Sequence, residues 1–262
     1  MFRWTNAAAV VRNTGVVGSS AMSVERLVPE MDTRAHVVRE HVARYEFASR
    51  FVAGKTVLDV ACGSGYGAVI LKSGGARAVT GMDVSDEAVS FARAHHSTDG
   101  IEFLVGDAER ISQDGPFEVI VSFETIEHIR HPETFLAEST RVLAPDGLLI
   151  VSTPVRLRGT LEERPANPHH LREWSVPEFR ALLGEHYRHI DIQGQYTFRK
   201  GVIPYSRTAK AWLFKLRYAE HAAELERMAV RESAPAFPGF AFAMGYVVAL
   251  CRQESRPGER ST

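Results

Sequence analysis

Residues 59–67 read Asp59-Val60-Ala61-Cys62-Gly63-Ser64-Gly65-Tyr66-Gly67, directly after the apolar run Thr56-Val57-Leu58. A short apolar run that ends in glycines is typical of a buried strand entering a tight turn. Glycines in such a turn allow the backbone to bend sharply and to approach a ligand closely. Gly63, Gly65 and Ala68 match the spacing of a dinucleotide-binding loop. That pattern is weakly specific alone, and a turn that binds no ligand is the alternative.

Expected strands and helices alternate along the chain on both sides of this glycine loop. A helix is expected over 33–51, Ser85 is suited to cap a second, and Pro132 to open a third. This alternation indicates an α/β fold with a mostly parallel sheet, whose strand ends carry the loops on one edge. The expected strands are 56–61, 78–82, 101–105, 117–123, 148–152, 190–195 and 241–251; the other helices are 66–73, 85–96 and 176–186, and Pro145-Asp146-Gly147 forms a turn.

Acidic side chains stand at the ends of the first three expected strands. Asp83 comes twenty residues after Gly63, where a carboxylate can accept hydrogen bonds from both ribose hydroxyls. Asp107 follows the third strand, and it suits a ligand whose adenine lies over that strand's end. Asp59 at the loop entrance would repel a pyrophosphate but attract an amino group. These features favour an adenosyl ligand that carries a cation rather than phosphates, which is S-adenosylmethionine.

Four segments together resemble the ordered motifs of class I S-adenosylmethionine-dependent methyltransferases. They are 59–67, 81–83, 106–108 and 143–147, and the similarity covers about residues 44–195. The resemblance implies a Rossmann-like seven-stranded sheet, mostly parallel with an antiparallel last strand, and helices on both faces. The cofactor-binding residues that it implies are Asp59, Ala61, Gly63, Gly65, Asp83, Val84, Asp107, Ala108 and Phe123, together with Tyr45, which either covers the cofactor or packs in the core.

A narrower similarity, to bacterial methyltransferases that act on sugars and on surface or storage glycans, lies at both ends of that region. It is carried by residues 25–29 and 40–45, by Ser152-Thr153-Pro154, and by 167–175. In the last of these motifs the third residue is usually aromatic and the fourth is histidine. His170 is therefore the matching histidine, and His169 departs from the pattern. The expected acceptor is a small molecule or a saccharide.

Acidic and imidazole side chains gather after the fourth expected strand, in Ser122-Phe123-Glu124-Thr125-Ile126-Glu127-His128-Ile129. A helical turn would bring Glu124 and His128, four residues apart, onto one face. His170, from a later loop, could fold over the same point. Methylation of an alcohol requires loss of its proton, so His128 or His170 is a candidate general base.

A divalent metal is the second interpretation of the same residues. Glu124, Glu127, His128 and His170 offer carboxylate and imidazole ligands that suit Mg²⁺, Mn²⁺ or Zn²⁺, and a bound metal would lower the pKa of an acceptor hydroxyl. The spacing resembles that of small-RNA 3′-end methyltransferases, which use a metal. A purely structural role, with both glutamates favoured at a helix N-terminus, is the third interpretation.

Composition narrows the classes of partner. The chain has 262 residues, 45% of them hydrophobic and 24% charged, and a net charge of −1. Acidic and basic residues are nearly equal in number, which gives no indication of a polyanion-binding surface, so nucleic acid is not expected as a partner. No apolar run is long enough to span a membrane. The two distant cysteines, Cys62 and Cys251, suit a reducing cytosol and a cytoplasmic protein, and a homo-oligomer is compatible with the sequence.

The expected organisation is a disordered leader over 1–21, followed by a single methyltransferase domain over 22–262. A helical insertion at about 197–240, with a charged helix over 207–231, would cap the sheet edge, or serve as a substrate lid or an oligomer contact. Metal-dependent methylation of an RNA or quinone-type acceptor is one alternative function. NAD-dependent oxidation is another, but the chain lacks a second nucleotide-binding half in the expected register, and Asp107 would have no role.

Overall fold

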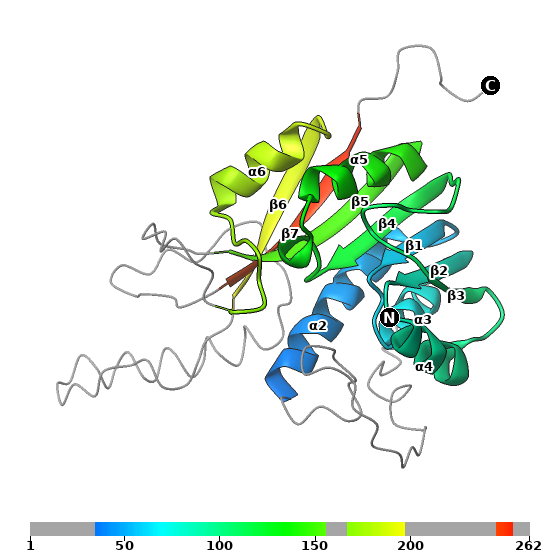
Figure 1. Ribbon diagram of the computed structural model, residues 1–262. Helices are drawn as coiled ribbons and strands as arrows, with labels where there is room; N and C mark the ends of the chain where they lie inside the picture. Colours follow the sequence, from blue (N-terminus) through cyan, green and yellow to red (C-terminus); the bar gives the residue numbers. More distant parts are fainter. Residues whose placement is uncertain (1–34, 156–166, 197–244, 254–262) are drawn as a thin grey trace, which may run out of the picture.

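The computed structural model describes residues 35–155, 167–196 and 245–253 (Figure 1). Seven strands form one sheet in the order β3-β2-β1-β4-β5-β7-β6. Their bounds are β1 Thr56–Val60, β2 Ala78–Asp83, β3 Ile101–Val105, β4 Phe117–Phe123, β5 Leu143–Val155, β6 His189–Tyr196 and β7 Gly245–Arg252. Neighbours from β3 to β5 pair in parallel, while β7 runs antiparallel to both β5 and β6. The expected α/β fold, with an antiparallel last strand, is confirmed.

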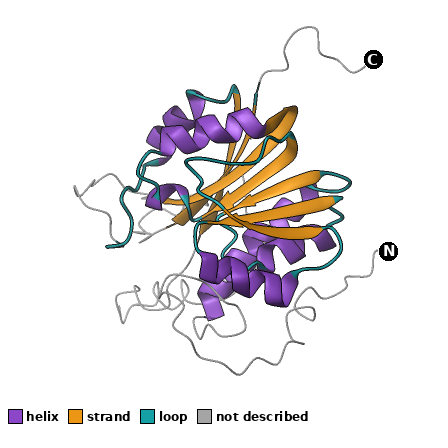
Figure 2. Cartoon of the chain, turned by 45° about the vertical axis from the view of Figure 1, so that its right-hand side comes forward, coloured by secondary structure: helices purple, strands orange, loops and turns teal. Residues whose placement is uncertain are grey.

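Helices cover both faces of the sheet, as Figure 2 shows. Side chains of α2 (Ala35–Ala48), α3 (Tyr66–Ser73) and α4 (Asp86–His96) pack with one set of strand residues into one buried cluster. Side chains of α5 (Pro132–Val142) and α6 (Val176–Gly184) pack with the alternate set into another. The central strands are buried on both sides, which explains their nearly continuous apolar sequences.

Local capping residues set the helix boundaries. Ser85 accepts a hydrogen bond from the backbone N–H of Ala88 and starts α4, and Pro132 opens α5, both as expected. Ser175 and Glu178 form a reciprocal capping box at the start of α6. Each cap satisfies backbone groups that a helix end leaves without an intrahelical partner, so these boundaries follow from nearby sequence.

The expected turn at 145–147 is wrong as a separate turn, because these residues lie within β5. Phe117 pairs with Leu143, whereas Val119 pairs with Leu148, so the segment between bulges out opposite Glu118. Its exposed Pro145 and Asp146 are turn-forming residues that the longer strand accommodates in the bulge.

The leader at 1–21 and the insertion at 197–240, with its helix at 207–231, lie outside the described residues. Within the described ranges, no helix combines the length and the apolar character needed to cross a bilayer.

Candidate functional site

The glycine loop occupies the carboxyl end of β1, at the centre of the sheet. Gly63 and Gly65 have φ values of 54° and 86°, which residues other than glycine rarely adopt. A Cβ atom at Gly65 would lie 2.8 Å from both Ala92 and the ring of Phe103, whereas nothing lies within 4 Å of one at Gly63. The loop therefore packs closely on one side, and it leaves open space beside Gly63 where a ligand can approach.

Asp83 ties the end of β2 to this loop. Its Oδ2 accepts a hydrogen bond of 2.9 Å from the backbone N–H of Gly63, and its Oδ1 accepts one of 2.9 Å from Ser85. Asp107, the second acid predicted to bind the cofactor's nucleoside, follows β3, the strand next to β2 in the sheet. It is exposed, and its Oδ1 accepts a hydrogen bond of 2.9 Å from the backbone N–H of Glu109. The glycine loop, Asp83 and Asp107 thus follow one another along a single edge.

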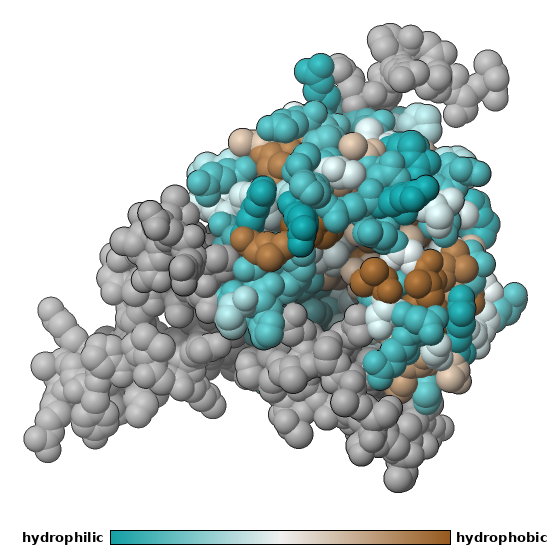
Figure 3. Space-filling model, in the orientation of Figure 1, coloured by the Kyte–Doolittle hydropathy of each residue, from teal (hydrophilic) through white to brown (hydrophobic). Residues whose placement is uncertain are grey.

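Apolar side chains are exposed beside these acids. Val84, which follows β2, is 69% exposed, and Val105, the last residue of β3, is 45% exposed. Apolar surface gathers in that part of the face drawn in Figure 3, and Ala108, half-buried, lies one residue beyond Asp107. Exposed apolar surface flanked by carboxylates is suited to a flat heterocycle attached to a diol.

Asp59 is fully buried at the end of β1. The hydroxyl of Tyr45 donates to its Oδ1 at 3.1 Å and lies 3.3 Å from Oδ2. Burial raises the pKa of Asp59 to about 8, the Tyr45 hydrogen bond opposes the shift, and the charge of Asp83 adds to it. A ligand amino group beside Asp59 would stabilise its charged form, so the residue fits the cation predicted for the ligand.

Aromatic rings pack around this carboxylate. Tyr45 meets the rings of Tyr66 and Phe123 edge to face, with centroids 5.4 and 5.0 Å apart. A Cβ atom at Gly67 would overlap the Tyr45 ring. Tyr45 therefore belongs to the buried core, which is one of its two expected roles, and its hydroxyl contacts Asp59.

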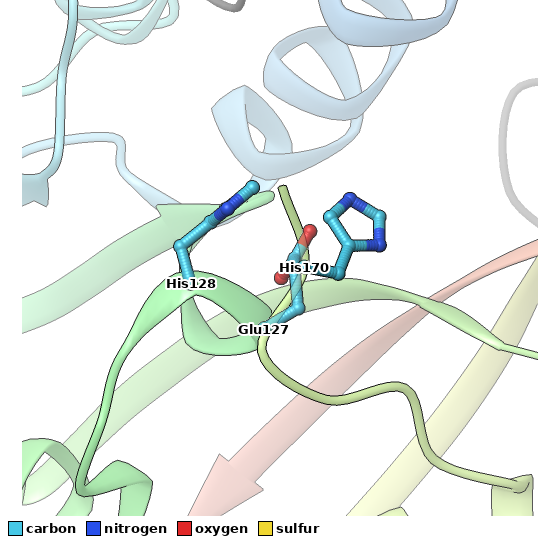
Figure 4. A group of neighbouring side chains, drawn as sticks. All are labelled: Glu127, His128 and His170. Atoms are coloured by element: carbon cyan, nitrogen blue, oxygen red, sulfur yellow. The ribbon is translucent and has the colours of Figure 1, made fainter. Parts of the chain in front are cut away.

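A second group of side chains follows β4, the strand beside β1. Glu127, His128 and His170 place one potential ligand atom each within 4.8 Å of one another. Figure 4 shows Glu127 and His128 on a short helical turn and His170 on the segment that precedes α6, with the three side chains converging. The turn is the 3-10 helix η2, Ile126–His128. Three of the four residues predicted to bind a metal are thus brought together.

Glu127 is the buried member of this group. Its Oε2 accepts a hydrogen bond of 3.2 Å from the Thr153 hydroxyl, while its Oε1 has no hydrogen-bond partner in the part of the chain that the structure describes. Burial, reinforced by the charge of Glu124, raises the pKa of Glu127 well above its usual range. A buried carboxylate oxygen without a partner is costly, and a cation or a ligand donor would satisfy it.

The backbone of the η2 turn also docks the His170 segment. The N–H groups of Leu171 and Arg172 donate to the backbone carbonyl of Glu127 at 2.9 and 3.3 Å. His128 and His170 meet edge to face with ring centroids 4.9 Å apart, and Nδ1 of His128 lies 3.1 Å from the carbonyl oxygen of His169. The two candidate bases are neighbours, as the sequence predicted.

Glu124 does not join this group, and the helical turn expected to align it with His128 is not formed. Its φ of 52° places it in the left-handed region, ahead of η2. Its Oε1 accepts a hydrogen bond of 2.8 Å from the Ser152 hydroxyl, whose oxygen in turn accepts from the Glu124 N–H at 3.2 Å. Among the described residues, Ala61 is the other non-glycine residue with positive φ. Both follow central strands at the same edge, where strained backbone is often functional.

Arg44 is a site residue that the sequence did not reveal. Its guanidinium is fully buried, donates from Nη1 to Oε1 of Gln195 at 2.7 Å, and lies 4.6 Å from the centroid of the Tyr246 ring. Its Nη2 is 4.0 Å from Oε1 of Glu124, and its charge opposes the raised pKa of Glu127. The sequence of α2 alone predicts an exposed arginine at this position. Its burial could not be predicted, because its partners Gln195 and Tyr246 come from β6 and β7.

Comparisons with known proteins agree with this geometry. A family model described as a methyltransferase domain matches residues 58–151. A "Probable S-adenosylmethionine-dependent methyltransferase" of Mycolicibacterium smegmatis is 34% identical over 161 residues, which are 61% of this chain and 62% of that protein. A "Ubiquinone biosynthesis O-methyltransferase" of Maricaulis maris is 36% identical over 104 residues, covering 38% of this chain and 41% of that one. The chain thus spans about three fifths of the first of these relatives, and less of the second.

Solved structures show the same fold at low sequence identity. The [4+2]-cyclase SpnF superimposes with a TM-score of 0.58 at 20% identity, over 88% of each chain. The YcgJ protein of Bacillus subtilis gives a TM-score of 0.58 at 19% identity, over 82% of this chain and 99% of that one. From the fold, the motif-bearing strand ends and the match at 58–151, we conclude that the chain contains a class I S-adenosylmethionine-dependent methyltransferase domain.

Proposed function

We propose that the protein transfers the methyl group of S-adenosylmethionine to a hydroxyl oxygen of a small-molecule or saccharide acceptor. The observation that carries the proposal is the convergence of Glu127, His128 and His170 beyond β4, next to the strand that holds the glycine loop. An O-methyltransferase among the similar proteins supports oxygen as the methylated atom. The likeness of residues 167–175 to glycan-modifying enzymes supports a saccharide.

The residues of the first three strand ends fit the cofactor. Gly63 and Gly65 would shape the backbone around it, Asp83 would accept hydrogen bonds from the ribose hydroxyls, and Asp59 would bind the amino group. Val84 and Ala108 would flank the adenine. When bound, S-adenosylmethionine supplies an electrophilic methyl group on a sulfonium sulfur.

The chain's own contribution is alignment and removal of one proton. The acceptor oxygen forms a bond to the methyl carbon as the sulfur–carbon bond breaks, which yields a methyl ether, S-adenosylhomocysteine and a proton. His128 or His170 takes that proton from the acceptor hydroxyl. Holding both reactants in place can supply roughly 7–11 kcal/mol of the barrier. The rings of Tyr45 and Phe123 are buried in contact with each other, and they would keep water from that side of the bound cofactor.

A metal-assisted form of the same reaction is favoured by one specific observation: Oε1 of Glu127 is buried and has no hydrogen-bond partner among the described residues. In that form Glu127, His128 and His170 would hold a divalent cation such as Mg²⁺, which lowers the pKa of an acceptor hydroxyl. The acceptor in that form would be a quinone-type molecule or an RNA. The three residues offer the carboxylate and imidazole donors that such ions accept.

One assay separates the two forms. S-adenosylhomocysteine release is measured with a panel of monosaccharides and catechols, with and without EDTA. In the metal-free form His128→Ala or His170→Ala lowers kcat by about 10²–10⁴ with unchanged S-adenosylhomocysteine affinity, and EDTA has no effect. In the metal form EDTA abolishes turnover and Mg²⁺ or Mn²⁺ restores it.

The exposed His131 provides the control, because His131→Ala should leave turnover unchanged. Wild-type turnover in the doubly substituted His128→Ala, His170→Ala protein would overturn both forms.

A further inference from the structure

His170 is held by side chains at both of its ring nitrogens. Nδ1 lies 2.9 Å from Oε1 of Glu173, and Nε2 lies 2.9 Å from Nδ2 of Asn167. The side chains of His170 and Glu173 are 8% and 3% exposed. A buried carboxylate therefore contacts an imidazole that also belongs to the Glu127–His128–His170 group.

The orientation of Asn167 decides which nitrogen carries the hydrogen. Its Oδ1 accepts a hydrogen bond of 3.0 Å from the backbone N–H of His169, so its amide nitrogen is the atom that faces His170. An amide N–H can only donate, and Nε2 of His170 must therefore accept. Nδ1 then carries the hydrogen and donates it to Glu173, since a neutral imidazole has one donor and one acceptor.

We propose that Glu173 is a positioning residue that fixes His170 in its Nδ1–H form, so that Nε2 is the nitrogen that acts on the acceptor. The amide N–H of Asn167 then occupies the place that the acceptor hydroxyl takes on binding. This inference rests on the proposed function of His170. It holds for either form of the reaction, because taking a proton and binding a metal both require a free lone pair on one ring nitrogen.

The contact between Glu173 and His170 is not needed to dock the segment that carries them. The backbone carbonyl of Glu127 already holds this segment through the N–H groups of Leu171 and Arg172. The 2.9 Å contact between Oε1 of Glu173 and Nδ1 of His170, with both side chains buried, places the carboxylate where it can orient the imidazole. His131 and Glu133 form a contrasting pair on the surface. Nδ1 of His131 lies 3.6 Å from Oε1 of Glu133, and the two side chains are 60% and 53% exposed.

Nitrogen NMR of the histidine side chains tests the inference without an acceptor. The full chain, ¹⁵N-labelled and saturated with S-adenosylhomocysteine, is measured at one fixed pH, and His170 is assigned by the signals absent from His170→Gln. We expect the Nδ1–H form in the wild type and in Glu173→Gln, whose carbonyl oxygen still accepts. Glu173→Met, of similar volume, removes the acceptor of the Nδ1–H and should weaken that preference, which the Asn167 amide then supports alone. A wild-type His170 in the Nε2–H form would overturn the inference.

Turnover on the best acceptor of the hydroxyl panel supplies the functional readout. Glu173→Met should lower kcat about 10–100-fold, the usual effect of removing such a partner, with unchanged S-adenosylhomocysteine affinity. Glu173→Gln should lose less than about tenfold, and Glu133→Met, the surface control, should lose nothing. Should Glu173→Met fail to fold, the tautomer of His170 in the wild type and the turnover of Glu173→Gln decide together.

The outcomes also separate this inference from the proposed function. If His170→Ala lowers kcat but Glu173→Met does not, or if Glu173→Gln is as damaged as His170→Ala, the positioning role is wrong while the base or metal role stands. If His170→Ala itself leaves kcat unchanged, the proposed function of His170 fails first.

Discussion

The hydroxyl of Tyr45 lies 3.1 Å from Oδ1 of Asp59, and both side chains are buried where β1 enters the glycine loop. The phenol is the hydrogen-bond donor that the structure gives this carboxylate. One hydrogen bond incompletely offsets the desolvation of the carboxylate, and the pKa of Asp59 is accordingly raised to about 8. The ligand-free protein therefore carries a destabilising group where the cofactor's amino group is expected.

Replacing Asp59 by asparagine should stabilise the ligand-free protein. The folded state keeps a proton on Asp59 that the unfolded state releases above about pH 4, so wild-type stability falls from about pH 4 to about pH 8 through this group. Asp59→Asn removes that dependence. The melting temperature of the variant should exceed that of the wild type by several degrees at pH 7.5, where 1 kcal/mol corresponds to roughly 2–4 °C, and the difference should shrink toward pH 5.

The same substitution should weaken S-adenosylhomocysteine binding, because the ligand's amino group loses its counter-charge. Asp107→Asn, at an exposed position, is the matched control for stability and should melt like the wild type. A melting temperature of Asp59→Asn below that of the wild type at pH 7.5 would contradict the assignment.

Gly67→Ala should destabilise the fold through Tyr45, since the added Cβ overlaps the phenol ring. Overpacking of this kind costs about 1–3 kcal/mol, which thermal denaturation would detect. Gly184→Ala is the control: the nearest atom to its added Cβ is Cδ1 of Ile190 at 3.9 Å, so its melting temperature should be unchanged or slightly higher. Equal melting temperatures of Gly67→Ala and the wild type would show that the ring moves away freely.

Glu124 and Glu127 should differ in the metal-assisted form of the reaction. Glu127 lies within the Glu127–His128–His170 group, and its Oε1 accepts no hydrogen bond from the described residues, whereas Glu124 is hydrogen-bonded to Ser152 and lies beside Arg44. Glu127→Gln should weaken Mn²⁺ binding at least about tenfold, a cost seen even for outer partners of a metal. Glu124→Gln should weaken it less. Electron paramagnetic resonance of free Mn²⁺ measures both, and equal losses, or no Mn²⁺ bound by the wild type, would rule out this arrangement.

Local sequence was enough to predict much of this fold. The glycine loop, the Ser85 cap and the Pro132 helix start depend on residues a few positions apart, and the acids Asp83 and Asp107 follow strands whose apolar runs are plain. The expectation of seven strands with an antiparallel last strand came from the resemblance to a family. The bulge in β5 was missed because it depends on register against β4.

The details of the site depend on distant partners. Glu124 takes its left-handed conformation beside the Ser152 hydroxyl, which comes from the neighbouring strand 28 positions away. Arg44 is buried against Gln195, 151 positions away. A helical pattern cannot distinguish such an arginine from a solvated one, because the distinction lies in residues that only the sheet brings near.

Calorimetric titration of S-adenosylhomocysteine into the wild type, Asp83→Ala and Asp86→Ala, with NAD as the competing ligand, tests the methyltransferase assignment at its cofactor. Each charge-assisted bond from Asp83 contributes on the order of 1.5–3 kcal/mol, so Asp83→Ala should bind at least about tenfold more weakly. Asp86→Ala, an exposed acid in the first turn of α4, should bind like the wild type, and NAD should give no heat. Tighter binding of NAD than of S-adenosylhomocysteine by the wild type, or an unchanged affinity in Asp83→Ala, would contradict the assignment.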